Sequence, residues 1–178
     1  MGTLTVTTAT GKRVIALEPL TGAAFRGYGD VIDREADDRR GHAINAGTAW
    51  RRHDLARVDA AGGGHAAISI VRAEPRPLPF RLQCLERHVL GSQAFVPLDT
   101  VRWIVVVAPG RSEPDLGGLR AFLTSSRQGV SYVRSTWHHP LIAIERAADF
   151  IVVDRVDDSG RDDCEVRSLG GVDLWIEA

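Results

Sequence analysis

The sequence predicts a mainly all-β fold, an antiparallel β-barrel or sandwich with one or two short helices. Apolar and polar residues alternate along much of the chain, as they do in half-buried strands, and long helical periodicity is scarce. Turn signals rich in glycine and proline separate these segments, for example at residues 62–64, 75–77 and 109–110. Short strands joined by such turns are typical of barrels and sandwiches rather than of alternating strand and helix folds.

Each predicted element is a period-two segment bounded by turn residues. In chain order, the predicted strands cover residues 13–17, 30–33, 50–58, 66–72, 80–88, 93–97, 101–108, 119–124, 131–134, 139–144, 150–156 and 164–168. The one clear helix is expected over residues 21–27, with Thr21 as its N-cap and with Ala24 and Phe25 facing inward. An acidic loop at 157–163 separates the last two strands and is expected to be solvated surface.

Length and composition indicate one globular domain. The chain has 178 residues, of which 44% are hydrophobic, and this is enough to bury a substantial core. We expect residues 1–12 to be a flexible tail and residues 13–178 to form a single catalytic domain. No internal repeat or long linker divides that domain.

Charge and cysteine usage restrict the possible partners and location. A formal net charge of −1 gives no long-range field that would attract nucleic acid or an anionic membrane. The start of the chain lacks an apolar signal segment, and the longest apolar run, 104–108, is too short to span a bilayer. Cys84 and Cys164 are widely spaced. We therefore expect a cytoplasmic protein with reduced thiols.

Glu86 and His88 form the first part of a predicted site. On an extended strand, Cys84, Glu86 and His88 share one face and Arg87 lies on the other. The interior of a barrel of about eight strands has room for side chains or one small ligand. The turn after His88 would fold the next strand back and bring the Gln93 amide near. The alternative is a hydrogen-bonded Glu86 and His88 pair on a solvated sheet face.

The second part is the histidine pair at 138–139. Adjacent residues on a strand alternate in direction, so both rings cannot face inward. We expect His138 to face the site, because Trp137 and His139 would then share the other face and could pack against a partner. The alternative is that both histidines cap the turn before Pro140. Cys84 is expected to be a small buried hydrophobe.

Several blocks, in matching order from about residue 13 onward, resemble the ureidoglycolate lyase family, formerly called ureidoglycolate hydrolase. They are residues 24–32 (AFRGYGDVI), 52–55 (RHDL), 85–95 (LERHVLGSQAF), 129–132 (GVSY) and 137–141 (WHHPL). The resemblance implies a cupin-like β-barrel that acts, usually as a homodimer, in allantoin and purine catabolism. It implies a lyase that cleaves ureidoglycolate to glyoxylate and urea.

The resemblance also implies a possible metal site. Glu86, His88, Gln93 and His138 can be compared with the metal-ligand positions of cupins, and a divalent ion such as nickel is associated with the family. The usual His-x-His is Glu-x-His in this chain, and Gln93 stands where cupins usually have Glu. No organic cofactor is expected.

Cleavage of ureidoglycolate requires a base, an acid and a cation for the carboxylate, because the substrate is a hemiaminal. Glu86 or His88 is the expected base, and His138 the expected acid or metal ligand. Arg72 is the expected carboxylate clamp, because a guanidinium matches a carboxylate in bidentate fashion; Arg120 is the alternative.

Substrate hydrogen bonds are expected from Ser92, Gln93 and Tyr132, and Asn45 is expected to border the site. Ser92 and Tyr132 could equally be ordinary turn or core residues.

Two other functions fit the same residues. One is a ureidoglycolate amidohydrolase, which would release ammonia instead of urea. The other is a non-catalytic cupin-like domain that binds a small acid. The concentration of protonatable groups on one predicted strand face favours an enzyme.

Overall fold

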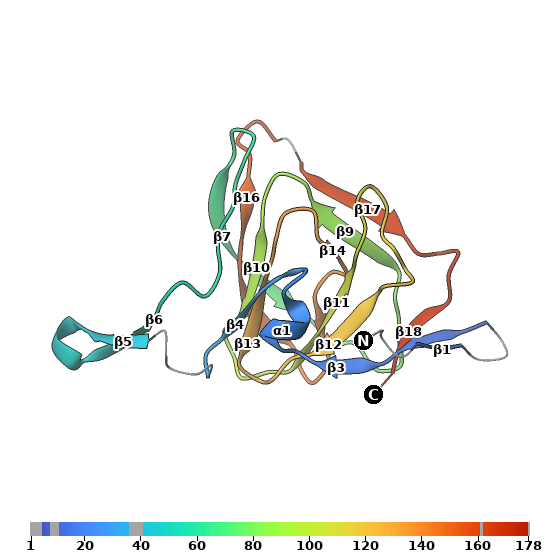
Figure 1. Cartoon of the computed structure of the whole chain (residues 1–178), viewed down its shortest axis with the longest axis horizontal. Helices are drawn as coiled ribbons and strands as arrows, with labels where there is room; N and C mark the ends of the chain where they lie inside the picture. Colours follow the sequence, from blue (N-terminus) through green and yellow to red (C-terminus); the bar gives the residue numbers. More distant parts are fainter. Residues whose placement is uncertain (1–4, 8–10, 36–40, 161, 178) are drawn as a thin grey trace.

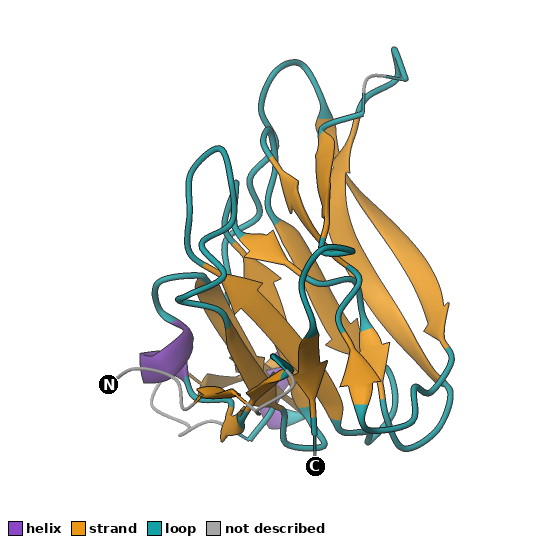
Figure 2. Ribbon diagram, turned by 90° about the vertical axis from the view of Figure 1, so that its right-hand side faces the viewer, coloured by secondary structure: helices purple, strands orange, loops and turns teal. Residues whose placement is uncertain are grey.

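The structure, a computed structural model, describes residues 5–7, 11–35, 41–160 and 162–177. Its regular secondary structure is almost entirely strand, arranged as layered sheets (Figures 1 and 2). The predicted all-β class with one or two short helices is confirmed, and the architecture is consistent with a cupin-like fold. No helix in the described residues is long and apolar enough to cross a membrane.

Two larger sheets carry most of the chain. The first has the order β4 (Gly29–Asp33), β13 (Gln128–Tyr132), β10 (Gln93–Pro97), β16 (Ala148–Val156), β7 (His65–Ala73). The second has the order β17 (Cys164–Ser168), β9 (Cys84–His88), β14 (Trp137–His138), β11 (Trp103–Ala108), β12 (Arg120–Leu123), β3 (Leu17–Pro19), and β15 (Ile142–Ala143) also pairs with β11. All pairings in these sheets are antiparallel except that of β12 with β3.

Two smaller sheets complete the described fold. One has the order β1 (Thr5–Thr7), β2 (Arg13–Ile15), β18 (Leu174–Ile176), β8 (Phe80–Arg81). The other is a hairpin of β5 (Gly41–Ile44) and β6 (Ala49–Arg52). The backbone of β1 pairs with β2, whereas the predicted flexibility of residues 1–12 stays a prediction.

Strand β11 explains the layering, because it is apolar on both faces. Trp103, Val105 and Val107 join a core cluster that also takes side chains from the first sheet. The alternate residues Ile104, Val106 and Ala108 join a second cluster with side chains from β18 and its neighbours. A strand that is buried on both faces has a continuous apolar sequence, as residues 103–108 do.

The two helices in the described residues are short. Helix α1 (Gly22–Phe25) begins where predicted, with the Thr21 hydroxyl accepting a hydrogen bond from the Ala24 amide at 3.2 Å. Phe25 is fully buried, as its inward position requires. The 3-10 helix η2 (Asn45–Gly47) joins β5 to β6.

Several predicted strands differ from those in the structure. The segment 13–17 divides into β2 and β3, which belong to different sheets, and 131–134 overlaps β13 only at residues 131–132. The segment 50–58 ends as a strand at Arg52, just before Asp54 adopts a positive φ of 55°. The segment 80–88 divides into β8 and β9, which belong to different sheets. The segment 139–144 keeps only β15, because Pro140 has no N–H to donate to a ladder. Strands β1, β5, β14 and β18 were not predicted.

The aromatic contact between Phe150 and Trp103 joins the two larger sheets, with ring centroids 5.3 Å apart and planes at 72°. We predict that Phe150→Ala lowers the free energy of unfolding by about 3–5 kcal/mol, because it leaves a cavity in the core. Equilibrium urea denaturation measures this loss. Val166→Ala is the matched control, because Val166 is 53% exposed, and its cost should lie within about 0.5 kcal/mol. Equal costs for both variants would contradict this account of the core.

Candidate active site

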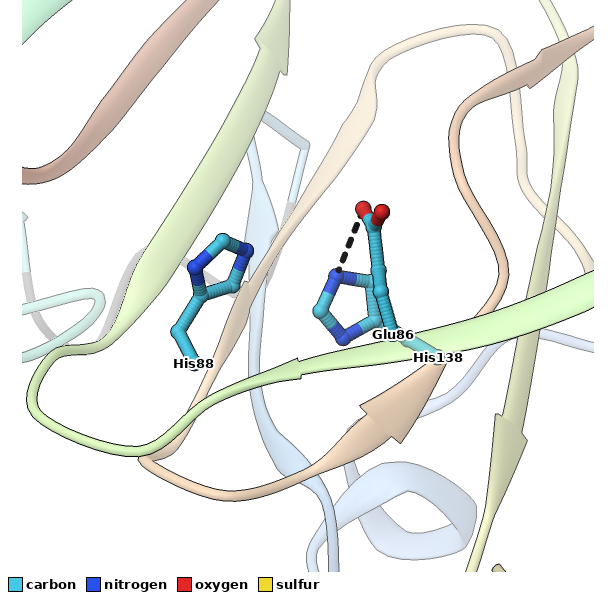
Figure 3. Close-up of side chains that lie close together, drawn as sticks. All are labelled: Glu86, His88 and His138. Carbon is cyan, nitrogen blue, oxygen red and sulfur yellow. Dashed lines mark ion pairs between the residues drawn. The ribbon is translucent and has the colours of Figure 1, made fainter. Parts of the chain in front are cut away.

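Glu86 and His88 on β9 and His138 on β14 converge on one point (Figure 3). One potential ligand atom from each residue lies within 4.8 Å of the others. His138 Nε2 is 3.5 Å from Glu86 Oε1, and the rings of His88 and His138 stack with centroids 5.7 Å apart. The three side chains meet because Glu86 and His88 share a strand face and His138 pairs directly with Glu86.

Gln93, on β10 of the first sheet, completes the group. Its side-chain oxygen lies 3.1 Å from His138 Nε2, and its side-chain nitrogen donates to Asp154 Oδ2 at 3.3 Å. The reverse amide orientation would place the Gln93 oxygen against the Asp154 carboxylate, which cannot donate when ionised. Asp154 therefore directs the Gln93 oxygen toward the site.

The environment of His138 fixes where its protons lie. Its Nδ1 is 2.9 Å from the Thr136 carbonyl oxygen, which can only accept, so Nδ1 carries a hydrogen. Its Nε2 faces two further acceptors, the oxygens of Gln93 and Glu86, and a hydrogen on Nε2 satisfies them. The Tyr132 ring stacks on the imidazole, with ring centroids 4.1 Å apart. Burial raises the pKa of the Tyr132 phenol. His138 is thus a buried proton donor with a fixed orientation.

His88 differs from His138 in offering a lone pair, rather than a hydrogen, at Nε2. Its Nδ1 lies 3.4 Å from Asp163 Oδ1, so that nitrogen is the natural donor, while the other Asp163 oxygen accepts from the Leu90 amide at 3.1 Å. His88 Nε2 is buried and has no hydrogen-bond partner among the described residues. With Nδ1 protonated, Nε2 offers a lone pair toward the site, which is the form that a base or a metal ligand requires.

Asp163 corrects one expectation. The segment 157–163 was predicted to be solvated surface, but Asp163 is only 8% exposed and is bonded to His88 and Leu90. The prediction fails there because a run of acidic residues looks uniform in sequence, whereas the chain turns inward just before β17. No local motif distinguishes Asp163 from Asp162.

Glu86 is set up to carry a negative charge. Burial raises the pKa of its carboxyl, but the hydrogen bond from His138 and the charges of His138, His88 and His139 outweigh that effect. The pKa of Glu86 therefore lies below its ordinary value, and the carboxylate is the dominant form near neutral pH.

A pocket of about 510 Å³ opens over this group, a volume typical of small-molecule sites. Glu86 and Gln93 line it beside an apolar wall that includes Phe95 and Val152. His88 and His138 are not among its lining residues, so Glu86 is the member of the convergent trio that the pocket exposes.

Two arginines also line the pocket. Arg72, the expected clamp, donates from Nη1 to Asp149 at 3.2 Å and lies 3.6 Å from Glu74. Arg76 was not predicted and lies over the Phe80 ring at 5.7 Å. The alternative clamp, Arg120, is bonded to Glu18 and lines a different cavity.

Other predicted residues lie outside the pocket. The Ser92 hydroxyl accepts from the Asp59 amide at 2.8 Å, so it secures a loop rather than lining the pocket. Asn45 lies in η2, at the tip of the β5–β6 hairpin. His139 faces away from the trio, with Nδ1 2.7 Å from the Pro140 carbonyl and its ring edge-on to Phe80.

Fold and site together define a β-sheet protein in which a carboxylate and two histidines converge, with the carboxylate lining a pocket of small-molecule size. A model of the family described as "Ureidoglycolate lyase" matches residues 12–176. The chain belongs to the ureidoglycolate lyase family.

Relatives are found in several bacteria. The chain is 51% identical over 144 residues to a protein of Burkholderia mallei named ureidoglycolate lyase, covering 80% of this chain and 83% of the relative. It is 48% identical over 151 residues to proteins of the same name in Escherichia coli and Shigella boydii, covering 85% of this chain and 91% of each relative.

We predict that Asp163→Ala lowers the free energy of unfolding by about 1–3 kcal/mol, because it leaves the Leu90 amide and His88 Nδ1 without their buried acceptor. Asp162→Ala is the neighbouring control. Asp162 is exposed and accepts only a local hydrogen bond from the Cys164 amide, so a smaller cost is expected. Urea denaturation of both variants provides the measurement, and equal costs would show that Asp163 is not a buried partner of His88.

Proposed function

We propose that this protein is a ureidoglycolate lyase that cleaves ureidoglycolate to glyoxylate and urea. The observation that carries the proposal is an ionised Glu86, exposed in a pocket of suitable size and backed by His138, in a chain of this family. We place the reaction in allantoin and purine catabolism, in the cytoplasm, and we expect a cupin-type homodimer.

The reaction is an elimination across the bond between the hydroxyl oxygen and the carbon that carries the urea group. The hydroxyl proton of ureidoglycolate leaves, the carbon–oxygen double bond of glyoxylate forms, and the carbon–nitrogen bond to urea breaks. The departing urea nitrogen gains one proton, so atoms and charge balance without water being consumed. An enzyme therefore needs a base near the hydroxyl and an acid near the nitrogen.

Glu86 is the base, because it is ionised and lines the pocket. His138 is the acid, because its Nε2 lies 3.5 Å from Glu86 and is surrounded by acceptors that favour a hydrogen there. Gln93 and Tyr132 hold the imidazole in place through its edge and its face. The positioned acid and base lie close enough to act on the hydroxyl oxygen and the urea nitrogen, which are bonded to the same carbon atom of the substrate.

Arg72 binds the substrate carboxylate. It lines the pocket, and a guanidinium can accept a carboxylate in bidentate geometry. Its present partners, Asp149 and Glu74, are more than a third exposed, so their contacts with Arg72 are weak and exchangeable. Arg76 adds a second positive charge to the same pocket.

The residues also fit a divalent metal ion. His88 Nε2 is buried without a partner among the described residues, and Glu86 and His138 offer ligand atoms nearby. The Asp163 carboxylate lies at Nδ1 of His88, as a carboxylate commonly does behind a metal-binding histidine. Glu86, His88 and His138 would hold the ion, with the Gln93 oxygen adjacent, and a divalent ion such as nickel would supply positive charge that stabilises a developing oxyanion. With an ion bound, Nε2 of His138 would be a ligand atom and would not donate a proton.

A product assay tests the proposed reaction. We predict that the purified protein releases urea and glyoxylate in equal amounts without ammonia. Glu86→Gln and His138→Ala should each lower kcat by about 10²–10⁴-fold, the usual contribution of a positioned acid or base, without loss of cooperative unfolding. Arg127→Ala is a surface control, because Arg127 pairs with Glu35 away from the pocket. Ammonia release would identify an amidohydrolase, and glyoxylate binding without turnover would identify a binding domain.

Chelation tests the metal. We predict that protein stripped with a chelator binds Ni²⁺ in calorimetry. Asp163→Ala should weaken this binding by about 10–100-fold, because it removes the carboxylate that orients the His88 ring through Nδ1. Activity that survives complete stripping, in protein that shows no heat of Ni²⁺ binding, would establish acid–base catalysis by the side chains alone.

A further inference from the structure

The β5–β6 hairpin, with its connecting η2, stands clear of the rest of the molecule in Figure 1. We call residues 41–52 the arm. Among the described elements, its substantial contacts run only between its own two strands and η2. An isolated two-stranded hairpin is marginally stable in water, so the arm requires a surface that the described part of its own chain does not supply. Trp50 on the arm is 53% exposed.

The outer face of the first sheet is a surface that lacks a cover. Ile68 and Ile70 on β7 are 76% and 68% exposed, and they alternate with Ser69 and Val71, which line the pocket on the inner face. Across the sheet, Ile70 pairs with Ile151 and Ile68 with Val153, both only half-buried. An antiparallel sheet with one free face normally keeps that face polar, so an apolar stripe here indicates that a protein surface covers it.

The same strand, β7, also forms one wall of the pocket. Ser69, Val71 and Ala73 form one pocket wall, and they belong to β7, the edge strand of the sheet. A long exposed edge strand is usually covered or blunted, and β7 has nine residues. The described chain provides no strand beyond it. The wall of the active site therefore ends at an unprotected edge.

The arm and the uncovered surface of β7 lie on one chain. A second copy of the chain can therefore supply the partner that each of them lacks. Two copies related by a two-fold axis can each supply an arm and each receive one, so the contact closes on itself. The charges are complementary. Residues 41–52 carry two arginines and no carboxylate, whereas the pocket lining has three carboxylates (Glu74, Glu86, Asp154) against two guanidiniums.

We infer that two copies pack through the outer faces of their first sheets, and that the arm of each reaches over the β7 edge of the other to complete its pocket. Asn45 lies at the tip of the arm, where positive φ angles of 51° and 56° at Asn45 and Ala46 form a tight turn that presents its amide. That amide then serves the active site of the neighbouring subunit. This inference goes beyond dimerisation itself, and its catalytic half rests on the proposed lyase function.

Mixed dimers test the exchange. One chain carries Glu86→Gln with an intact arm, and the other carries Asn45→Ala with an intact pocket; two different affinity tags isolate the heterodimer. Asn45→Ala homodimers should lose about tenfold in turnover, as expected for one lost hydrogen bond to a charged substrate. The heterodimer pairs the intact arm with the intact pocket of the other chain, so it should regain about half of the wild-type rate, because one of two symmetric sites works. A rate no higher than that of the parent variants would overturn the exchange.

The mass of the protein in solution gives a readout that does not depend on catalysis. Light scattering should report a dimer for the wild type and a monomer for the double variant Ile68→Asp, Ile70→Asp. Val166→Asp, an exposed apolar residue on β17, is the matched control and should remain dimeric. A monomeric wild type, or a dimer unaffected by the double substitution, would overturn the interface even if the lyase activity is present. A dimer that responds as expected but cleaves no ureidoglycolate would refute the proposed function alone.

Discussion

The two-residue strand β14 is the constraint on which the site depends. It lies between β9 and β11, so that His138 pairs with Glu86 on one side and with Val107 on the other. Trp137, its neighbour, is fully buried in the second core cluster and fixes which way the strand faces. Because adjacent strand residues point to opposite sides, burying the indole turns the His138 imidazole toward Glu86. A hydrophobic contact in the core thus sets the direction of the side chain that we propose as the acid.

A second hydrogen bond then fixes each polar group from behind. Asp163 holds His88, Asp154 holds Gln93, and the Thr136 carbonyl holds His138. The effect is that the side-chain oxygens of Glu86 and Gln93 lie against Nε2 of His138, while the His88 ring stacks with the His138 ring. Burying a polar group costs free energy unless it is hydrogen-bonded. Each of these supporting hydrogen bonds therefore stabilises the orientation in which it holds its partner. The one buried atom left without a partner in it, His88 Nε2, faces the place where a ligand or a metal ion would bind.

Strand alternation predicted the centre of the site but not its supports. The pattern around residue 86 placed Glu86 and His88 on one face, and the turn after His88 returned the chain so that Gln93 joined them, although Gln93 contacts His138 rather than His88. Asp163 and Asp154 escaped prediction, because an acidic loop gives no local signal that Asp163 is buried and an ordinary strand gives none that Asp154 contacts Gln93. The segment 50–58 was wrongly extended as a strand, since nothing in the sequence shows that Asp54 turns the chain. Contacts between distant segments, which decide these features, leave no periodic pattern.

We propose that Glu86 is the base and His138 the acid in the cleavage of ureidoglycolate. A crystal structure with glyoxylate bound would test these roles. The account predicts glyoxylate in the pocket lined by Glu86, Gln93 and Phe95, with its aldehyde oxygen within hydrogen-bonding distance of Glu86 or His138 and its carboxylate toward Arg72. Glyoxylate bound instead in the cavity beside Arg120 and Arg134, with the Glu86 pocket free of it, would contradict the account.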